Sequence, residues 1–292
     1  MISGSMVALV TPMTVDGDVD YDALAALIDW HETEGTHCLV VAGTTGESAT
    51  LEVNEHLEVI RFCQERVGAR IPIIAGTGAN STREAIHLTS RAQAFGVAAC
   101  LLVTPYYNKP TQEGLFQHYA AIASACAGDL ILYNVPGRTA VDMANETTLR
   151  LAAIQNIVGI KDATGDLTRG IELLKAAPEG FAVYSGDDAT AIDLILAGAK
   201  GDISVTANVA PKLMSKACEL ALAGDSEGAK AVDAKLSSLH RDLFVEANPI
   251  PVKWALSQLG RCEATMRLPL TTLDSKFHSV VNSALKEAVS SN

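Results

Sequence analysis

The sequence has no long apolar run, and this absence excludes one class of protein. None of its apolar segments reaches the roughly 18 consecutive residues of a membrane-spanning helix. No basic segment precedes the first apolar run, which ends at Thr11-Pro12. We therefore expect no signal peptide, no membrane contact and a location in the cytoplasm.

An excess of positive charge is also absent. The chain has 22 Lys and Arg residues against 34 Asp and Glu residues, which gives a net charge of -12. An acidic chain without a basic cluster binds the phosphates of nucleic acids and anionic membranes poorly. The composition therefore predicts no nucleic-acid partner.

Metal-binding and disulfide spacings are absent as well. No CxxC or CxxH pattern joins the six cysteines, Cys38, Cys63, Cys100, Cys126, Cys218 and Cys262. The seven histidines form no HExxH or HxH pair. This usage is typical of reduced thiols in a cytosolic protein and predicts neither a disulfide framework nor a zinc site. It argues against a metal-dependent aldolase.

The sequence does contain a repeated pattern, in which a short apolar run is followed by a longer segment of helical period. The expected strands lie at residues 6–10, 38–42, 71–75, 98–103, 130–135, 157–160, 181–184 and 202–205. The expected helices lie at residues 21–34, 54–66, 81–95, 112–126, 145–154, 167–176, 189–196 and 212–223. Runs that are apolar throughout are typical of parallel strands covered by helices. Eight such units predict an α/β fold, a (β/α)₈ barrel over residues 1–224.

The pattern changes after residue 224. Helical segments at 227–244, 251–259 and 274–289 follow one another with no strand between them. We interpret residues 225–292 as a C-terminal helical extension packed on the barrel. In such a barrel, functional residues lie where the strands end and the loops to the following helices begin.

One lysine lies in such a position. Lys161 stands near the end of the sixth expected strand, which is apolar on both faces. Burying an ammonium group without a partner costs free energy, so burial favours the neutral amine. The neutral amine is the form that attacks a carbonyl to make a Schiff base. The alternative is that the side chain extends to solvent.

The loop after the second expected strand has the composition of an anion site. Residues 43–48 read Gly-Thr-Thr-Gly-Glu-Ser, and two glycines frame two hydroxyl residues. Such a loop can direct backbone N–H groups at a carboxylate or a phosphate. It is not a P-loop, because no Gly-Lys pair follows. The alternative is a tight turn selected for its geometry alone.

Two further residues lie near the end of the fifth expected strand. Tyr133 stands one strand before Lys161 and can relay a proton during Schiff-base formation. Arg138, beyond a Pro-Gly turn, can hold a carboxylate through two hydrogen bonds. The alternative for Arg138 is a surface ion pair.

The loops after two other strands leave choices open. Tyr106 and Tyr107 lie between two prolines. They could place hydroxyls in a site or anchor a subunit interface, and the two roles are compatible. Asp187 and Asp188 could bind a metal or cap the helix that starts near Ala189. No histidine at another strand end completes a metal site, so we favour the cap.

Taken together, three motifs resemble the class I pyruvate-dependent aldolase and lyase family. They are residues 43–47 (GTTGE), 133–139 (YNVPGRT) and 159–165 (GIKDATG), and the likeness runs from Ser5 to the last helix. The chain is most similar to the members that condense pyruvate with L-aspartate 4-semialdehyde, in lysine and diaminopimelate biosynthesis. The resemblance implies a lyase that needs no metal and no organic cofactor.

The resemblance also implies roles for catalytic residues. Lys161 would form the Schiff base with pyruvate, and Tyr133 would relay protons. Thr44 would link Tyr133 to Tyr107, which in the family comes from a neighbouring subunit. The site would therefore need a homo-oligomer, which in the family is commonly a tetramer built as a dimer of dimers.

Substrate contacts follow from the same resemblance. The backbone amides of Thr44 and Thr45 would hold the pyruvate carboxylate. Gly186 and Ile203 would line the pocket. Arg138 would hold the carboxylate of L-aspartate 4-semialdehyde.

The family also has a feedback site for L-lysine at a dimer interface. The matching positions in this chain are Ser48, Ala49, His56, Asn80, Glu84 and Tyr106. The chain departs from the pattern at Val53, where lysine-inhibited relatives often carry histidine. We expect a lysine site whose binding is weakened by the loss of that polar contact.

Two other interpretations compete with this one. N-acetylneuraminate lyase and 2-keto-3-deoxy sugar acid aldolases would share Lys161, Tyr133 and the 43–48 loop. Arg138 separates them, because it suits a second substrate that carries a carboxylate. A non-catalytic barrel that binds an amino acid or a keto acid would not need Lys161 beside Tyr133.

Overall fold

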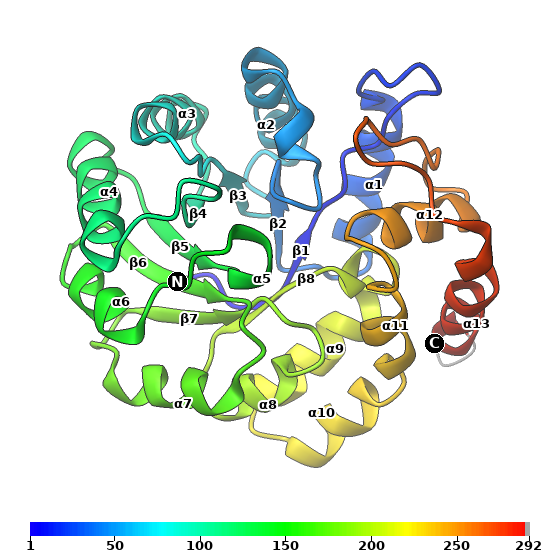
Figure 1. Cartoon of the computed structure of the whole chain (residues 1–292). Helices are drawn as coiled ribbons and strands as arrows, with labels where there is room; N and C mark the ends of the chain where they lie inside the picture. The colour runs from blue at the N-terminus through cyan, green and yellow to red at the C-terminus, as the bar shows by residue number, and fades with distance from the viewer. Residues whose placement is uncertain (290–292) are drawn as a thin grey trace.

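The computed structural model describes residues 1–289, and its eight parallel strands close into a barrel (Figure 1). The strands are β1 (Gly4–Ala8), β2 (Cys38–Val41), β3 (Ile73–Gly76), β4 (Ala99–Val103), β5 (Leu130–Asn134), β6 (Ile157–Asp162), β7 (Ala182–Ser185) and β8 (Gly201–Ser204). Each strand pairs with the next, and β8 closes the barrel on β1. The predicted (β/α)₈ fold is confirmed.

Helices surround the barrel on the outside (Figure 1). They are α1 (Tyr21–Thr33), α2 (Val53–Val67), α3 (Thr82–Ala94), α4 (Gln112–Ala125), α6 (Asn145–Ala152), α7 (Leu167–Ala176), α8 (Ala191–Leu196) and α9 (Pro211–Leu222). A short helix that the sequence pattern did not predict, α5 (Pro136–Thr139), follows β5. Short 3-10 turns lie at Ser48–Thr50 (η1) and Thr206–Asn208 (η2).

Apolar side chains pack on both sides of the strands. Inside the barrel, the buried cluster includes Met6, Ala8, Cys38, Val40, Ile74, Leu101, Ile131, Tyr133, Tyr184 and Ile203. A larger cluster lies between the strands and the helices. Each fully buried Leu, Ile or Val side chain stabilises the fold by about 2 kcal/mol relative to exposure. This double burial explains why the strands are apolar throughout.

The first strand begins earlier than expected. The prediction for residues 6–10 was wrong in its bounds, because β1 covers Gly4–Ala8 and pairs with β8 from Gly4 opposite Gly201. A Cβ atom at Gly201 would lie only 2.1 Å from the carbonyl oxygen of Gly4. Glycine therefore permits the close backbone approach that starts the ladder there.

The helices after residue 224 differ from the prediction in one place. The expected helix at 227–244 is two helices, α10 (Ser226–Asp233) and α11 (Ser237–Asp242). The break lets the His240 ring lie 2.9 Å from Thr206 Oγ1 and 3.2 Å from Asp233 Oδ1. This contact joins α11 to the barrel.

Two further helices, α12 (Ile250–Gln258) and α13 (His278–Val289), complete the described chain, with a 3-10 turn at Ser275–Phe277 (η3). α13 packs against α11 and α12 at one side of the barrel, coloured orange to red in Figure 1. The division into a barrel (1–224) and an extension (225–292) stays a prediction, and residues 290–292 of that extension lie outside the described range. None of the helices within residues 1–289 is long and apolar enough to cross a membrane.

Candidate active site

The Lys161 amine lies inside the barrel. Lys161 is on β6 directly beside Tyr133 of β5, and the whole residue is only 6% exposed to solvent. Its Nζ atom lies 4.6 Å from the centre of the Tyr133 ring. The alternative that Lys161 extends to solvent is therefore wrong. The geometry places a buried amine over the ring of a tyrosine on the neighbouring strand.

Two predicted lining residues shape the space around this amine. At Gly186, after β7, a Cβ atom would lie 2.5 Å from Cε of Lys161. The glycine therefore leaves the room that the lysine side chain occupies. Ile203 of β8 is buried in the same interior cluster as Tyr133.

The 43–48 loop is held from the C-terminal part of the chain. Thr45 is buried, and its Oγ1 atom accepts a hydrogen bond of 2.9 Å from Nδ2 of Asn248. In this bond the Thr45 hydroxyl is the acceptor, so its own hydrogen can still be donated. Sequence reasoning missed Asn248, because these two residues are 203 positions apart and no motif surrounds Asn248.

Arg138 lies exposed on α5, close to the same asparagine. Its Nη2 atom donates to the carbonyl oxygen of Asn248 at 3.0 Å. Within residues 1–289, no carboxylate lies close enough to form an ion pair with Arg138. The surface ion-pair alternative is therefore wrong, and the other N–H groups of the guanidinium can bind a ligand.

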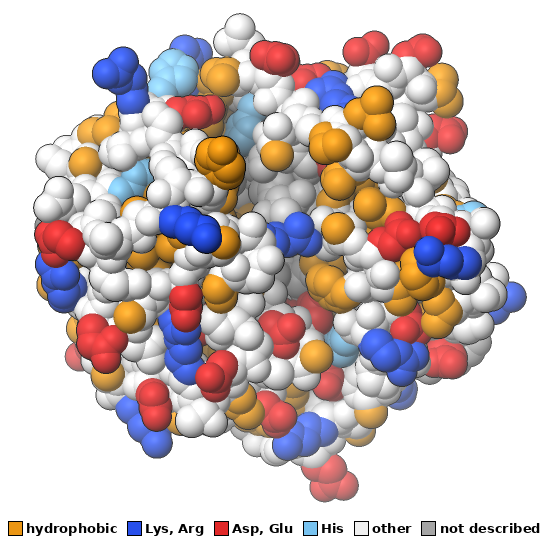
Figure 2. Space-filling view, in the orientation of Figure 1, with side chains coloured by type: hydrophobic (Ala, Val, Ile, Leu, Met, Phe, Trp, Pro, Cys, Tyr) orange, Lys and Arg blue, Asp and Glu red, His pale blue; other side chains and the backbone are white. Residues whose placement is uncertain are grey.

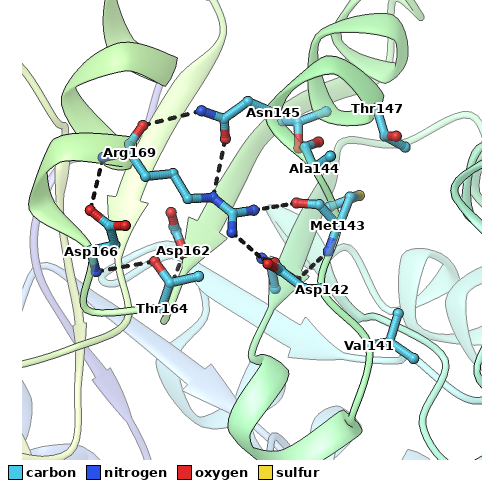
Figure 3. Close-up of polar contacts among 12 residues, drawn as sticks. Val141, Asp142, Met143, Ala144, Asn145, Thr147, Asp162, Thr164, Asp166 and Arg169 are labelled. Carbon is cyan, nitrogen blue, oxygen red and sulfur yellow. Dashed lines mark hydrogen bonds and ion pairs between the residues drawn. The ribbon is translucent and has the colours of Figure 1, made fainter.

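A polar cluster fixes the ends of β5 and β6 (Figure 3). Asp142 accepts a hydrogen bond from Asn134 at 2.8 Å and another from Arg169 at 2.7 Å. Asp162, the residue after Lys161, accepts from the backbone N–H of Thr164 at 2.9 Å. Burial raises the pKa of Asp162 above its ordinary value. These contacts hold the strand ends that carry Tyr133 and Lys161.

The acidic pair after β7 does not cap a helix as predicted. Asp188 Oδ2 accepts from the backbone N–H groups of Val205 at 3.1 Å and Thr206 at 3.0 Å. Asp187 Oδ2 accepts from the hydroxyl of Thr190 at 2.7 Å. The cap prediction was wrong, because Asp188 instead fixes the turn after β8. Residues 1–289 contain no group of three His, Cys, Asp or Glu side chains that could hold a metal ion.

Most of the predicted regulatory residues meet at one cavity of about 440 Å³. Its lining includes Ser48, Ala49, His56, Glu84 and Tyr106. Thr44 and Arg138 line the same cavity, whereas Lys161 and Tyr133 do not. Asn80 contributes through a hydrogen bond of 3.2 Å to the carbonyl oxygen of Tyr106. Figure 2 shows the face that carries α5 hollowed near its centre.

Tyr107 is, together with Thr44, a predicted catalytic residue that no hydrogen bond joins to Lys161 or Tyr133 within residues 1–289. It is 89% exposed, with a left-handed backbone at φ 74°. Within residues 1–289, no hydrogen bond or ring contact joins Tyr107 to Thr44 or Lys161. A contribution from a neighbouring subunit stays a prediction, as does the proton relay through Thr44.

Comparisons with known proteins show which family the chain belongs to. The model of the dihydrodipicolinate synthetase family matches residues 1–288. A 4-hydroxy-tetrahydrodipicolinate synthase of Cellvibrio japonicus is 60% identical, covering 99% of each chain. The crystal structure of the chloride-inhibited dihydrodipicolinate synthase of Acinetobacter baumannii, complexed with pyruvate, has a TM-score of 0.98. It is 57% identical and covers 99% of each chain.

A more distant structure carries a second ligand. The dihydrodipicolinate synthase of Cyanidioschyzon merolae with lysine bound has a TM-score of 0.95 and 38% identity. The match covers 99% of this chain and 98% of that one. From the extent and identity of these matches, the present chain belongs to the dihydrodipicolinate synthetase family.

Proposed function

We propose that the chain condenses pyruvate with L-aspartate 4-semialdehyde through a Schiff base on Lys161. The chain is a lyase of its family, and relatives about 60% identical are named 4-hydroxy-tetrahydrodipicolinate synthase. The observation that carries the proposal is the buried Lys161 amine, 4.6 Å from the Tyr133 ring centre.

The reaction follows from the chemistry of this amine. Lys161 attacks the keto carbon of pyruvate, and loss of water gives an imine, with Tyr133 relaying the protons. Loss of a methyl proton turns the imine into an enamine, whose carbon attacks the aldehyde of the second substrate. The amino group of that substrate then attacks the imine carbon and releases Lys161. The ring product is 4-hydroxy-tetrahydrodipicolinate, and one water is formed overall.

Two carboxylate contacts orient the substrates. The backbone amides of Thr44 and Thr45, with the Thr45 hydroxyl, bind the pyruvate carboxylate. Arg138 binds the carboxylate of the semialdehyde through N–H groups that no carboxylate within residues 1–289 engages. The Arg138 contact favours this reaction over the cleavage of sugar acids by related aldolases.

The proposal includes an oligomer. Tyr107 would complete the proton relay of a neighbouring subunit, as its exposure within one chain allows. The assembly would be a tetramer formed as a dimer of dimers. Six free cysteines are consistent with action in the cytoplasm.

We also place an L-lysine regulatory site in the cavity lined by Ser48, His56 and Glu84. The lysine-bound relative supports this assignment. Val53, which lines the same cavity, offers no polar contact, so the affinity would be modest. Calorimetry and inhibition assays test the site, and saturating L-lysine that gave neither heat nor loss of turnover would contradict it.

A coupled assay tests the reaction itself. Purified enzyme is supplied with pyruvate and L-aspartate 4-semialdehyde, and separately with N-acetylneuraminate. We expect rapid turnover of the first pair and none of the sugar acid. The opposite result would assign the chain to the sugar acid lyases.

A further inference from the structure

A fully buried ion pair joins the 43–48 loop to α12. Lys253 of α12 donates to Oε1 of Glu47 at 2.5 Å, and the two side chains are 0% and 1% exposed. Burial lowers the pKa of Lys253, and the neighbouring carboxylate opposes that change. Removing two charges from water costs free energy, which only good geometry offsets. The pair therefore calls for an explanation beyond general stability.

Glu47 is constrained in its backbone as well as its side chain. Its φ of 56° is left-handed, a conformation that residues other than glycine rarely adopt. Its second carboxylate oxygen accepts from the backbone N–H of Arg267 at 3.1 Å. Arg267 in turn holds Glu55 of α2 through two bonds of 2.6 Å. Both oxygens of Glu47 are thus bound to residues that follow the barrel in the chain.

The segment that carries Lys253 also contacts the loop at a second point. Asn248, two residues before α12 begins, donates to Thr45 through its side chain and accepts from Arg138 through its carbonyl. The loop is therefore held at Thr45 and at Glu47 by residues only five positions apart in the chain. The position of the loop is therefore tied to that of α12.

From this arrangement, and resting on the proposed function, we infer that Lys253 and Glu47 are positioning residues for pyruvate. Their ion pair fixes the backbone amides of Thr44 and Thr45 in the orientation that binds the pyruvate carboxylate. Lys253 also balances the charge of Glu47, an anion two residues from Thr45, through a direct ion pair. An uncompensated carboxylate there would oppose the binding of a second carboxylate.

Borohydride trapping measures this effect without the second substrate. The fraction of chain that carries reduced pyruvate is followed against pyruvate concentration for the unmodified enzyme and for Lys253→Met. We expect the half-saturating pyruvate concentration to rise by about tenfold in the variant, because the interaction that is lost acts on binding. The kcat at saturating pyruvate and the KM for L-aspartate 4-semialdehyde should each change by less than about threefold.

The exposed pair Lys276–Asp274 supplies a matched control on the same side of the molecule. Lys276→Met should leave the half-saturating concentration unchanged. A second variant, Glu47→Gln combined with Lys253→Met, leaves no unpaired charge at this buried position and therefore avoids the main threat to folding. Its half-saturating concentration should still rise by about fivefold, because the loop is no longer fixed.

The outcomes separate the inference from the proposed function. If the double variant binds pyruvate like the unmodified enzyme, the pair only stabilises the fold and the inference is wrong, whatever the melting temperature. If the unmodified enzyme forms no pyruvate adduct at all, the proposed function fails, and the inference fails with it.

Discussion

At the scale of single residues, the position of Lys161 depends on a missing side chain. A Cβ atom on Gly186 would lie 2.5 Å from Lys161 Cε and 2.8 Å from the Cβ of Ala163. Contacts this short force the lysine or the strand end to move. Position at a strand end pointed to Lys161, and the family resemblance pointed to Gly186, but only the folded structure shows that one makes room for the other.

We predict that Gly186→Ala displaces the lysine amine and lowers kcat/KM by about 100-fold, the cost typical of a displacement near 1 Å in a reacting group. Steady-state kinetics with both substrates measure the effect. Gly137→Ala is the control, because a Cβ atom there meets nothing within 4 Å. Equal activity in the two variants would show that Lys161 tolerates displacement.

How much of the site could be foreseen depended on distance along the chain. Lys161 and Tyr133 stand near the ends of neighbouring strands, so the barrel pattern alone predicted that they lie side by side. The 43–48 loop follows β2, at the same end of the barrel. Asn248 and Lys253 reach the loop from 203 and 206 positions away. Contacts of that kind leave no local pattern, and only the packed structure reveals them.

At the scale of elements, Arg169 at the start of α7 joins three neighbours. It donates to Asp142, to the carbonyl oxygen of Met143 and to Asn145, while its own backbone N–H binds Asp166 (Figure 3). These contacts attach α7 to the segment between β5 and α6. Their loss should loosen the ends of two neighbouring strands.

We predict that Arg169→Met lowers the free energy of unfolding by about 2 kcal/mol, because charged hydrogen bonds in a half-buried cluster are lost. Denaturant unfolding measures this. Arg66→Met removes the exposed pair with Asp29 and should cost only about 0.5 kcal/mol. Equal losses in the two variants would mean that the Arg169 cluster is an ordinary surface contact.

Helix α1 contains a histidine that should make the fold sensitive to acid. His31 is fully buried, and burial, with a smaller effect from Arg261, lowers its pKa from 6.5 to about 3. As the pH falls below 6.5, the pKa of this histidine in the unfolded chain, the unfolded chain binds a proton that the folded chain does not. Stability is therefore lost as the pH falls between 6.5 and about 3.

The loss from His31 between about pH 7 and about pH 5 is roughly 2 kcal/mol. His31→Leu removes this contribution, so the stability advantage of the unmodified chain over the variant should shrink by that amount at the lower pH. Urea unfolding of both proteins at the two pH values is the measurement. If the difference in unfolding free energy between the two proteins were the same at both pH values, His31 would not be a neutral, buried imidazole.

The errors in predicting elements have physical causes. The early start of β1 came from the Gly4–Gly201 approach, which hydrophobic patterning does not register. The expected helix at 227–244 broke because Thr206 and Asp233 bind His240, a tertiary contact that overrides local helical preference. The order and type of the barrel elements followed from periodicity and were confirmed.

At the scale of the whole molecule, the exposed Tyr107 predicts that one chain is not a complete catalyst. Two inactive variants, Tyr107→Ala and Lys161→Ala, are mixed after mild dissociation and reassembled. If Tyr107 serves the neighbouring subunit, mixed dimers contain one intact site, and about a quarter of full activity returns. Mixtures that stay inactive while size analysis shows mixed dimers would place Tyr107 outside the shared site.

The central claim is that Lys161 is the nucleophile, and one measurement tests it most directly. The enzyme is incubated with pyruvate, reduced with borohydride, digested and analysed by mass spectrometry. We predict a single reduced pyruvate adduct on Lys161, and none in Lys161→Ala. An adduct on another lysine, or full activity without any adduct, would contradict the mechanism.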